Sequence, residues 1–170
     1  MAHNRIIEAL LERRSLRSYR TEQISEEELH EVLHAAKYAP TARGLQARHF
    51  TVIQNKQLLA DIAAAAAENG SDSPFYNAPT VIVLSAPEDA KYGREDCACA
   101  IMNCMFAAES LGLGSCYIGS GLDILRNESI RSRLKLPQGY VPFGSVTIGY
   151  PKEHAPSPKE RRTDDISYVQ

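Results

Sequence analysis

Several features that would assign this chain to a familiar class are missing from its sequence. No apolar run approaches the ~20 residues that a membrane-spanning helix needs, and residues 1–4 are followed by charge, unlike a secretory signal. The net charge is only −2, whereas a nucleic-acid-binding protein should carry a basic surplus over a whole face. We therefore expect a cytoplasmic protein that binds neither a membrane nor nucleic acid.

Motifs for metal binding and for hydrolysis are missing as well. The chain has four cysteines, none paired as Cys-x-x-Cys, namely Cys97, Cys99, Cys104 and Cys116. This spacing favours reduced thiols over a zinc or iron–sulfur site. His30 and His34 share a helix face but lack a third ligand, so no metal site is predicted. With no Gly-x-Ser-x-Gly nucleophile either, any difficult chemistry would fall to a cofactor.

The length and the hydrophobic pattern predict one domain over residues 1–170 with an α+β architecture. Helices are expected at residues 5–14, from Ser25 to Pro40, and at 56–69, 94–111 and 127–135. Strands are expected at residues 49–53, 80–84, 115–118 and 143–150. Helices and strands alternate without a strict β-α-β rhythm, which favours three layers with a central mixed sheet flanked by helices.

Three segments carry more specific information about packing. Ser25 and Glu28 form a capping box that predicts a helix start. The helix at 94–111 is apolar around most of its circumference, which is typical of a core or of a subunit interface. The tail at 152–170 is polar, but Ile166 and Tyr168 could pair along the sheet edge of another subunit.

The segment at residues 13–20 concentrates positive charge. It contains four arginines and three hydroxyl groups, in the order Arg13, Arg14, Ser15, Arg17, Ser18, Tyr19 and Arg20. Arginine binds phosphate through two parallel donors, and serine adds a hydroxyl bond to the same group. One interpretation is therefore a site for a phosphate-bearing ligand. The other is a solvated basic helix end that complements the helix dipole.

Two further loops have unusual compositions. Residues 40–48 are rich in hydrogen-bond donors, and residues 112–121 are rich in glycine. The glycine-rich loop lacks the dinucleotide fingerprint, because Tyr117 stands where the third glycine is required. Its glycines would instead suit a close approach of the backbone to a flat ligand.

Together these motifs resemble the nitroreductase family of FMN-dependent flavoproteins. The opening motifs are Arg13-Arg14-Ser15-x-Arg17-x-Tyr19 and Pro40-Thr41-Ala42-x-Gly44-x-Gln46-x-x-His49-Phe50. In the same order follow Ala78-Pro79, Gly112-Leu113-Gly114-Ser115-Cys116-Tyr117-Ile118-Gly119, Leu136-Pro137-x-Gly139-Tyr140, Ile148-Gly149-Tyr150-Pro151 and Lys159-x-Arg161. The resemblance covers nearly the whole chain. It implies a mainly antiparallel sheet, a homodimer, and a C-terminal arm at 152–170 that packs on the partner subunit.

The resemblance also implies which residues hold FMN. The phosphate of FMN would be bound by Arg13, Arg14, Ser15, Lys159 and Arg161. Arg17 would reach the pyrimidine edge of the flavin. The other subunit would contribute Pro40, Thr41, Ala42, Gly44 and Gln46. The flavin ring would lie along Ile118, Gly119 and Ser120. No side chain is expected to be catalytic, because flavin N5 would carry the chemistry.

The implied activity is that of an FMN-dependent oxidoreductase. Hydride would pass from NADH or NADPH through flavin N5 to a nitroaromatic, quinone or similar acceptor by a ping-pong route. Two alternatives stay open: a flavin-binding or flavin-processing protein of the same fold without nitroreductase activity, and a non-enzymatic module for a phosphate-bearing ligand. The first is motivated by Arg48, which would add positive charge near the site, and by the small residues at 42–47. As a further departure from the family pattern, Ser71 and Pro74 offer no cation.

Overall fold

A four-stranded sheet forms the middle layer of the computed structural model, which describes residues 4–70 and 72–170. Its strands are β1 (His49–Ile53), β2 (Thr80–Pro87), β3 (Gly114–Ile118) and β4 (Tyr140–Gly149). The helices are α1 (Arg5–Glu12), α2 (Glu26–Lys37), α3 (Lys56–Glu68), α4 (Gly93–Ser110), α5 (Leu122–Arg126) and α6 (Glu128–Arg131), with a short 3-10 helix, η1 (Ala42–Gly44). Ser71, one of the predicted departures, lies outside the described residues.

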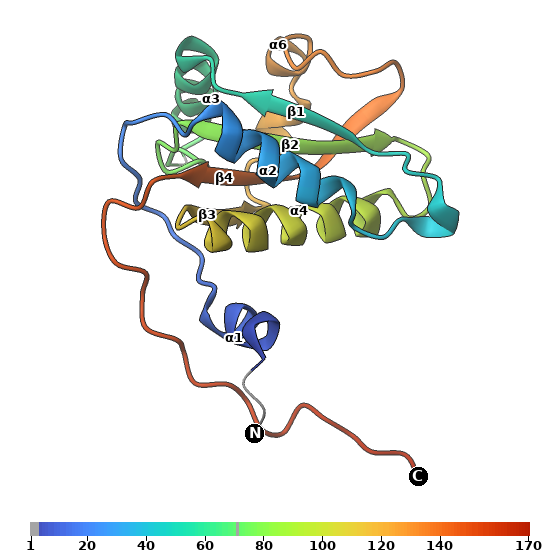
Figure 1. Cartoon of the computed structure of the whole chain (residues 1–170). Helices are drawn as coiled ribbons and strands as arrows, with labels where there is room; N and C mark the ends of the chain where they lie inside the picture. Colours follow the sequence, from blue (N-terminus) through green and yellow to red (C-terminus); the bar gives the residue numbers. More distant parts are fainter. Residues whose placement is uncertain (1–3, 71) are drawn as a thin grey trace.

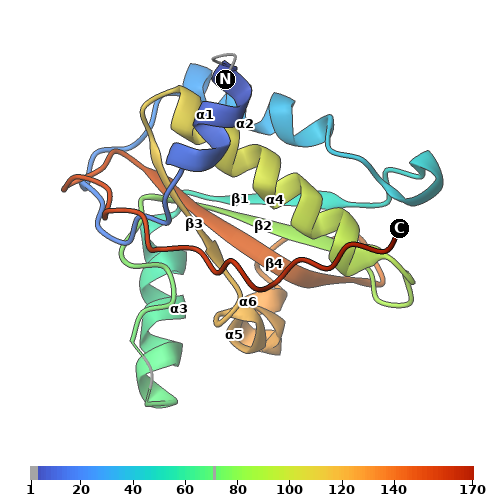
Figure 2. The ribbon, with the colours of Figure 1, turned by 90° about the horizontal axis from the view of Figure 1, so that it is seen from below.

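The sheet is antiparallel in the order β1-β2-β4-β3. Helices α2 and α4 cover one face, and α3, α5 and α6 cover the other (Figures 1 and 2). Along β2, Ile82 and Leu84 enter the first core, whereas Val81 and Val83 enter the second. All four are fully buried, because successive side chains of a strand point to opposite faces. The predicted three-layer α+β fold is therefore confirmed.

Local signals place most helix ends where the sequence predicts them. At the start of α2, the Ser25 hydroxyl accepts a bond from Glu28 N at 3.1 Å, and Ser25 N donates to Glu28 Oε2 at 2.7 Å. The helix expected at 127–135 forms over a shorter stretch, α6, which begins directly after Asn127. Asn127 has a non-helical ψ of 131°, and its side chain accepts a bond from Ser129 N. Helix α5, which precedes it, was not predicted.

Helix α4 is apolar on both its faces, but one chain covers only one of them. Cys97, Ile101 and Cys104 are fully buried against the sheet and α2. On another side of the helix, Met102 stays 37% exposed, and Leu111, directly after the helix, is 38% exposed. Burial all round is therefore not reached within one chain, and these apolar side chains stay available to a partner.

Two terminal segments lie outside the three layers (Figures 1 and 2). Helix α1 buries none of its residues, and its apolar side chains Ile6 and Leu11 are 73% and 69% exposed. The arm at 152–170 is exposed along its whole length and contains no helix or strand. Within the described part of the chain, no helix is both long and apolar enough to cross a membrane.

The segment that follows α1 is fixed to the sheet by a buried tyrosine. The Tyr19 hydroxyl donates to Leu16 O at 2.6 Å and shares a 2.7 Å bond with Thr147 Oγ1. Burial raises the pKa of Tyr19, so the hydroxyl stays neutral and available as a donor. These bonds hold residues 16–19 beside β3 and β4.

We expect Tyr19→Phe to destabilise the fold by about 1–3 kcal/mol, because the buried Leu16 O loses this donor and Thr147 Oγ1 loses one partner, keeping its 3.3 Å bond to Cys116 O. Urea unfolding of the purified protein measures this loss. Tyr38→Phe is the matched control, because Tyr38 is 78% exposed and the change should stay within about 0.5 kcal/mol. Equal stability of the Tyr19 variant and the wild type would contradict this role.

Candidate functional site

The arginine-rich segment lies against the start of β3. A parallel bridge joins Ser15 to Ser115, and Leu16 N donates to Ser115 O at 2.8 Å. Gly114 allows this approach, since an added Cβ would lie 2.1 Å from the Leu16 side chain. The close approach predicted for this glycine loop is therefore made at Gly114 by the protein's own Leu16, and not by a ligand.

The arginines of this segment have different roles. Arg14 Nη1 donates to Leu11 O at 2.6 Å and to Arg13 O at 2.8 Å, so this arginine serves the end of α1. By contrast, Arg13 Nη1, Arg14 Nε and Ser115 Oγ are buried without a hydrogen-bond partner among residues 4–70 and 72–170. Buried polar groups of a folded protein are nearly always paired. Two cationic donors and a hydroxyl at one end of β3 fit a phosphate, which offers several anionic oxygens.

The surroundings of Cys116 show which side chains lie close to one another beside β3. Burial raises the pKa of the Cys116 thiol, while the nearby Arg17, a hydrogen bond with Ser15, and Arg13 act in the opposite direction. The thiol is 2% exposed and is held neutral, so it is no candidate nucleophile. Sequence reasoning selected neither Ser115 nor Cys116 as a site residue, although both lie in the motif at 112–119. Their positions beside the arginines depend on the pairing of Ser15 with β3.

A cavity of about 540 Å³ lies beyond Arg17. Its lining includes Tyr76, Ser120 and Asp123, and the Arg17 guanidinium carbon lies 5.8 Å from the centroid of the Tyr76 ring. Of the residues predicted along a flavin ring, Gly119 and Ser120 are exposed next to this cavity, whereas Ile118 is buried. Tyr76 is a further candidate that the sequence motifs did not indicate.

The loop at residues 40–46 lies at the other end of α4. Ala42 N donates to Asp96 Oδ1 at 2.9 Å, and Asp96 belongs to the first turn of α4. Arg14 shares a pocket with Glu109, which belongs to the last turn of α4. Thirteen residues of helix separate Asp96 from Glu109, which is roughly 20 Å at 1.5 Å per residue. Figure 1 shows η1 and the segment after α1 at opposite ends of the domain.

The predicted site residues are therefore divided within one chain. One group contains Arg13, Arg14, Ser15 and Arg17 near β3, and the other contains Pro40, Thr41, Ala42, Gly44 and Gln46 near the start of α4. Lys159 and Arg161 lie in the exposed arm. Within the described ranges, neither makes a hydrogen bond or ion pair with the arginine cluster. A single chain does not assemble the full predicted set.

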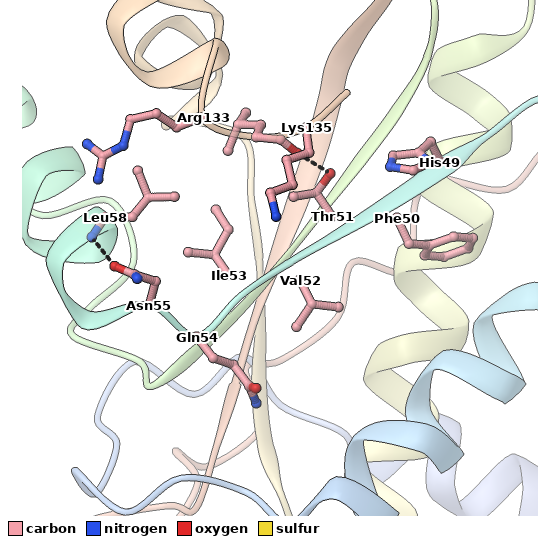
Figure 3. Close-up of a pocket in the computed structure, with 11 residues that line it drawn as sticks. His49, Phe50, Thr51, Val52, Ile53, Gln54, Asn55, Leu58, Arg133 and Lys135 are labelled. Carbon is pink, nitrogen blue, oxygen red and sulfur yellow. Dashed lines mark hydrogen bonds between the residues drawn. The ribbon is translucent and has the colours of Figure 1, made fainter. Parts of the chain in front are cut away.

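A second pocket of about 540 Å³ lies along β1, an edge strand of the sheet (Figure 3). Thr51 Oγ1 donates to Leu134 O at 3.1 Å, and Arg133 and Lys135 also line the pocket. Arg133 is paired with Asp61 at 2.6 Å. None of the predicted site residues lines this pocket. It therefore offers a free strand edge and cationic side chains, and no part of the predicted cofactor site.

The guanidinium of Arg48 is hydrogen-bonded to the backbone beside the loop at 40–46. It donates to Lys37 O at 2.8 Å and Ala39 O at 2.9 Å, with longer bonds to Ala36 O and Pro40 O. The cation complements the C-terminal end of the α2 dipole, so Arg48 has a structural role. Its positive charge stays next to the loop, as the sequence suggested.

The described residues contain no cluster of three or more side chains able to hold a metal ion. His34 instead contacts the rings of His30 and Tyr38, at centroid distances of 6.0 and 5.2 Å. The cysteines are free thiols. The arrangement thus consists of donors for an anion next to a cavity, and of a second loop about 20 Å away.

Comparison with known proteins identifies the family. The sequence profile of the Nitroreductase family matches residues 10–75 and 67–150, which together make up most of the chain. The chain belongs to the nitroreductase family. The two matches contain the arginine cluster, the loop at 40–46 and strand β3, so the predicted membership is confirmed.

One relative of this chain comes from Archaeoglobus fulgidus and is provisionally named NADH dehydrogenase/NAD(P)H nitroreductase. It is 35% identical over 145 residues, covering 83% of this chain and 82% of the relative. A nitroreductase from Bacteroides fragilis with bound FMN has a TM-score of 0.89 at 28% identity, covering 99% and 100% of the two chains. An FMN-dependent nitroreductase from Clostridium difficile has a TM-score of 0.85 at 30% identity, covering 98% and 99%. The FMN of these neighbours agrees with the cofactor predicted from the sequence.

Proposed function

We propose that this protein is an FMN-dependent oxidoreductase that uses NADH or NADPH to reduce a nitroaromatic, quinone or similar acceptor. One observation carries the proposal: the buried and unpartnered Arg13 Nη1, Arg14 Nε and Ser115 Oγ at the start of β3. Leaving such groups unpaired costs about 1–3 kcal/mol each, and more where the group is charged. A phosphate at this place would satisfy them, and FMN is bound in the neighbouring structure from Bacteroides fragilis.

The chain's own residues would bind and orient the cofactor. Arg13 and Ser15 would hold its phosphate, together with Ser115, and Lys159 and Arg161 of the arm would add positive charge. When bound, FMN supplies hydride transfer at N5. Arg17 brings a cation to the cavity that Tyr76 lines, where it would stabilise negative charge on a reduced ring. No side chain is required as an acid or a base. Nicotinamide and acceptor would occupy this cavity in turn.

The active form that we propose is a homodimer with FMN at the subunit interface. The loop at 40–46 lies about 20 Å from the arginine cluster of its own chain, so a second chain would supply it. The exposed side chains of α1, Met102 and Leu111 offer the apolar surface for such an interface. The arm would pack on the partner, and the β1 edge of Figure 3 offers its apolar residues Ile166 and Tyr168 a place to pair.

The alternative of a flavin-processing protein rested on Arg48 and on the small residues at 42–47. In the folded chain the Arg48 guanidinium is bound by backbone carbonyl groups. No other contact in the described residues favours it. We therefore retain the oxidoreductase as the proposed activity.

An absorbance spectrum of the purified protein, with FMN added if it is colourless, tests the proposal first. We expect a visible flavin band that NADH or NADPH bleaches under anaerobic conditions and that a quinone restores. A bound flavin that neither nucleotide bleaches would instead support a flavin-binding protein without reductase activity. Failure to bind FMN would leave the arginine cluster as a basic helix end.

A further inference from the structure

The loop at residues 40–46 has a backbone that needs external support. Arg43, Gly44 and Gln46 have φ values of +53°, +65° and +50°. Arg43 and Gln46 carry side chains, and left-handed backbone is costly for such residues. Such a conformation persists where the surrounding structure holds it, and it is found most often at ligand sites.

Arg48 holds one end of this loop. Its Nη2 lies 2.8 Å from Lys37 O, 2.9 Å from Ala39 O and 3.4 Å from Ala36 O, and its Nη1 lies 3.2 Å from Pro40 O. The carbonyls of Ala36 and Lys37 belong to the last turn of α2, and those of Ala39 and Pro40 to the chain entering the loop. One planar guanidinium thus ties the helix end to the loop, which the single ammonium of a lysine could not do.

Further contacts fix Arg48 itself and the path back from the loop. The guanidinium carbon of Arg48 lies 5.9 Å from the centroid of the Phe50 ring in β1. Arg48 N also donates to Gln46 O at 2.8 Å, and Gln46 N donates to Thr41 Oγ1 at 3.1 Å. The two ends of the loop are therefore linked to each other and to β1.

Asp96 holds the middle of the loop from the opposite side. Its Oδ1 accepts the bond from Ala42 N at 2.9 Å, and its place in the first turn of α4 favours a carboxylate. The loop thus lies between two helix ends. Arg48 binds the chain at the C-terminal end of α2, and Asp96 binds the loop at the N-terminal end of α4. Neither Arg48 nor Asp96 was among the predicted site residues.

We infer that Arg48 and Asp96 are positioning residues that preorganise the loop at 40–46 for the cofactor bound by the partner subunit. The inference rests on the proposed function, in which this loop completes the FMN site. Neither residue touches the cofactor. Both keep the hydrogen-bond donors of the loop in a left-handed conformation that the loop would not hold without them. When either residue is removed, part of the free energy of FMN binding is spent on ordering the loop.

The test compares Arg48→Met, Arg48→Lys and Asp96→Ala with wild type. Hydrogen exchange of the loop amides is measured without FMN, and FMN affinity by titration of the apoprotein. We expect faster hydrogen exchange at Ala42 and Gln46 in Arg48→Met and Asp96→Ala. In the same two variants the Kd for FMN should rise about tenfold, because the loop loses a charge-assisted hydrogen bond that orders it. Arg48→Lys should restore only part of this loss, because the charge returns without the planar fork.

Lys37→Met is the matched control. Lys37 is exposed in the last turn of α2, so this change removes a positive charge from the same helix end and leaves the carbonyl bonds in place. We expect exchange and FMN affinity to stay within about twofold of wild type. A Lys37 variant that behaves like Arg48→Met would overturn the inference, because charge alone would then explain both effects.

The outcomes separate this inference from the proposed function. A wild-type protein that binds no FMN overturns the proposed function, and the exchange rates then still report whether the two residues hold the loop. If wild type binds FMN and the Arg48 and Asp96 variants bind it equally well, the positioning role is overturned alone. Should Arg48→Met fail to fold, Asp96→Ala and Arg48→Lys decide by the same two measurements.

Discussion

Replacing Arg13 with alanine is expected to raise the Kd for FMN about 10- to 100-fold, the range for losing one hydrogen bond between charged groups. Arg13 Nη1 is buried and has no hydrogen-bond partner among the described residues, so its donor is free for a ligand. Arg14 should matter less, since its Nη1 is bound by two carbonyl groups at the end of α1. Fluorescence titration of the apoprotein with FMN measures both effects.

Arg20→Ala is the matched control for Arg13. Arg20 belongs to the same basic segment, but it is exposed and its Nε donates to Pro151 O at 3.1 Å. If the segment attracts the phosphate only by its overall charge, both variants should lose similar affinity. If Arg13 binds the phosphate directly, Arg20→Ala should stay within about threefold of wild type, because an exposed charge is screened by salt. An unchanged Kd in Arg13→Ala would refute the phosphate assignment.

Mixing two inactive variants is expected to restore FMN sites. Arg13→Ala damages the cluster near β3, and Gly44→Leu places a side chain in the loop at the far end of α4. An added Cβ at Gly44 meets no atom within 4 Å in its own chain, so the main structural cost is the positive φ, about 1–2 kcal/mol. Each variant alone should bind FMN weakly. In a mixed dimer, one site carries both damaged parts and the other carries none.

Co-refolding equal amounts of the two variants should therefore give tight binding at about a quarter of all sites, because half of the dimers are mixed and each has one intact site. The number of tight sites is counted by titration, with each variant refolded alone as the control. If one chain formed the whole site, no tight site would return in the mixture. That result would overturn the shared site and leave the phosphate assignment of Arg13 untouched.

Short-range patterns explain why much of this protein could be predicted. The capping box of Ser25 and Glu28 forms within four residues, so its geometry is fixed by spacing alone. The continuous apolar run of β2 requires cover on both faces, whatever elements provide it. Helix α5 was missed, and the helix expected at 127–135 is longer than α6, because helices of five and four residues are too short for a periodic pattern to define them.

By itself, the sequence determined most of the elements, the three-layer architecture, the family and the clustering of cations at residues 13–20, since these depend on spacing along the chain. The tertiary structure decided how each polar group is used. It commits Arg14 Nη1 to the end of α1 and Arg48 to the end of α2, and it leaves Arg13 Nη1, Arg14 Nε and Ser115 Oγ without a hydrogen-bond partner among the described residues. The physical reason is that a guanidinium binds whichever acceptor the fold brings within reach, and that acceptor is usually distant in the sequence.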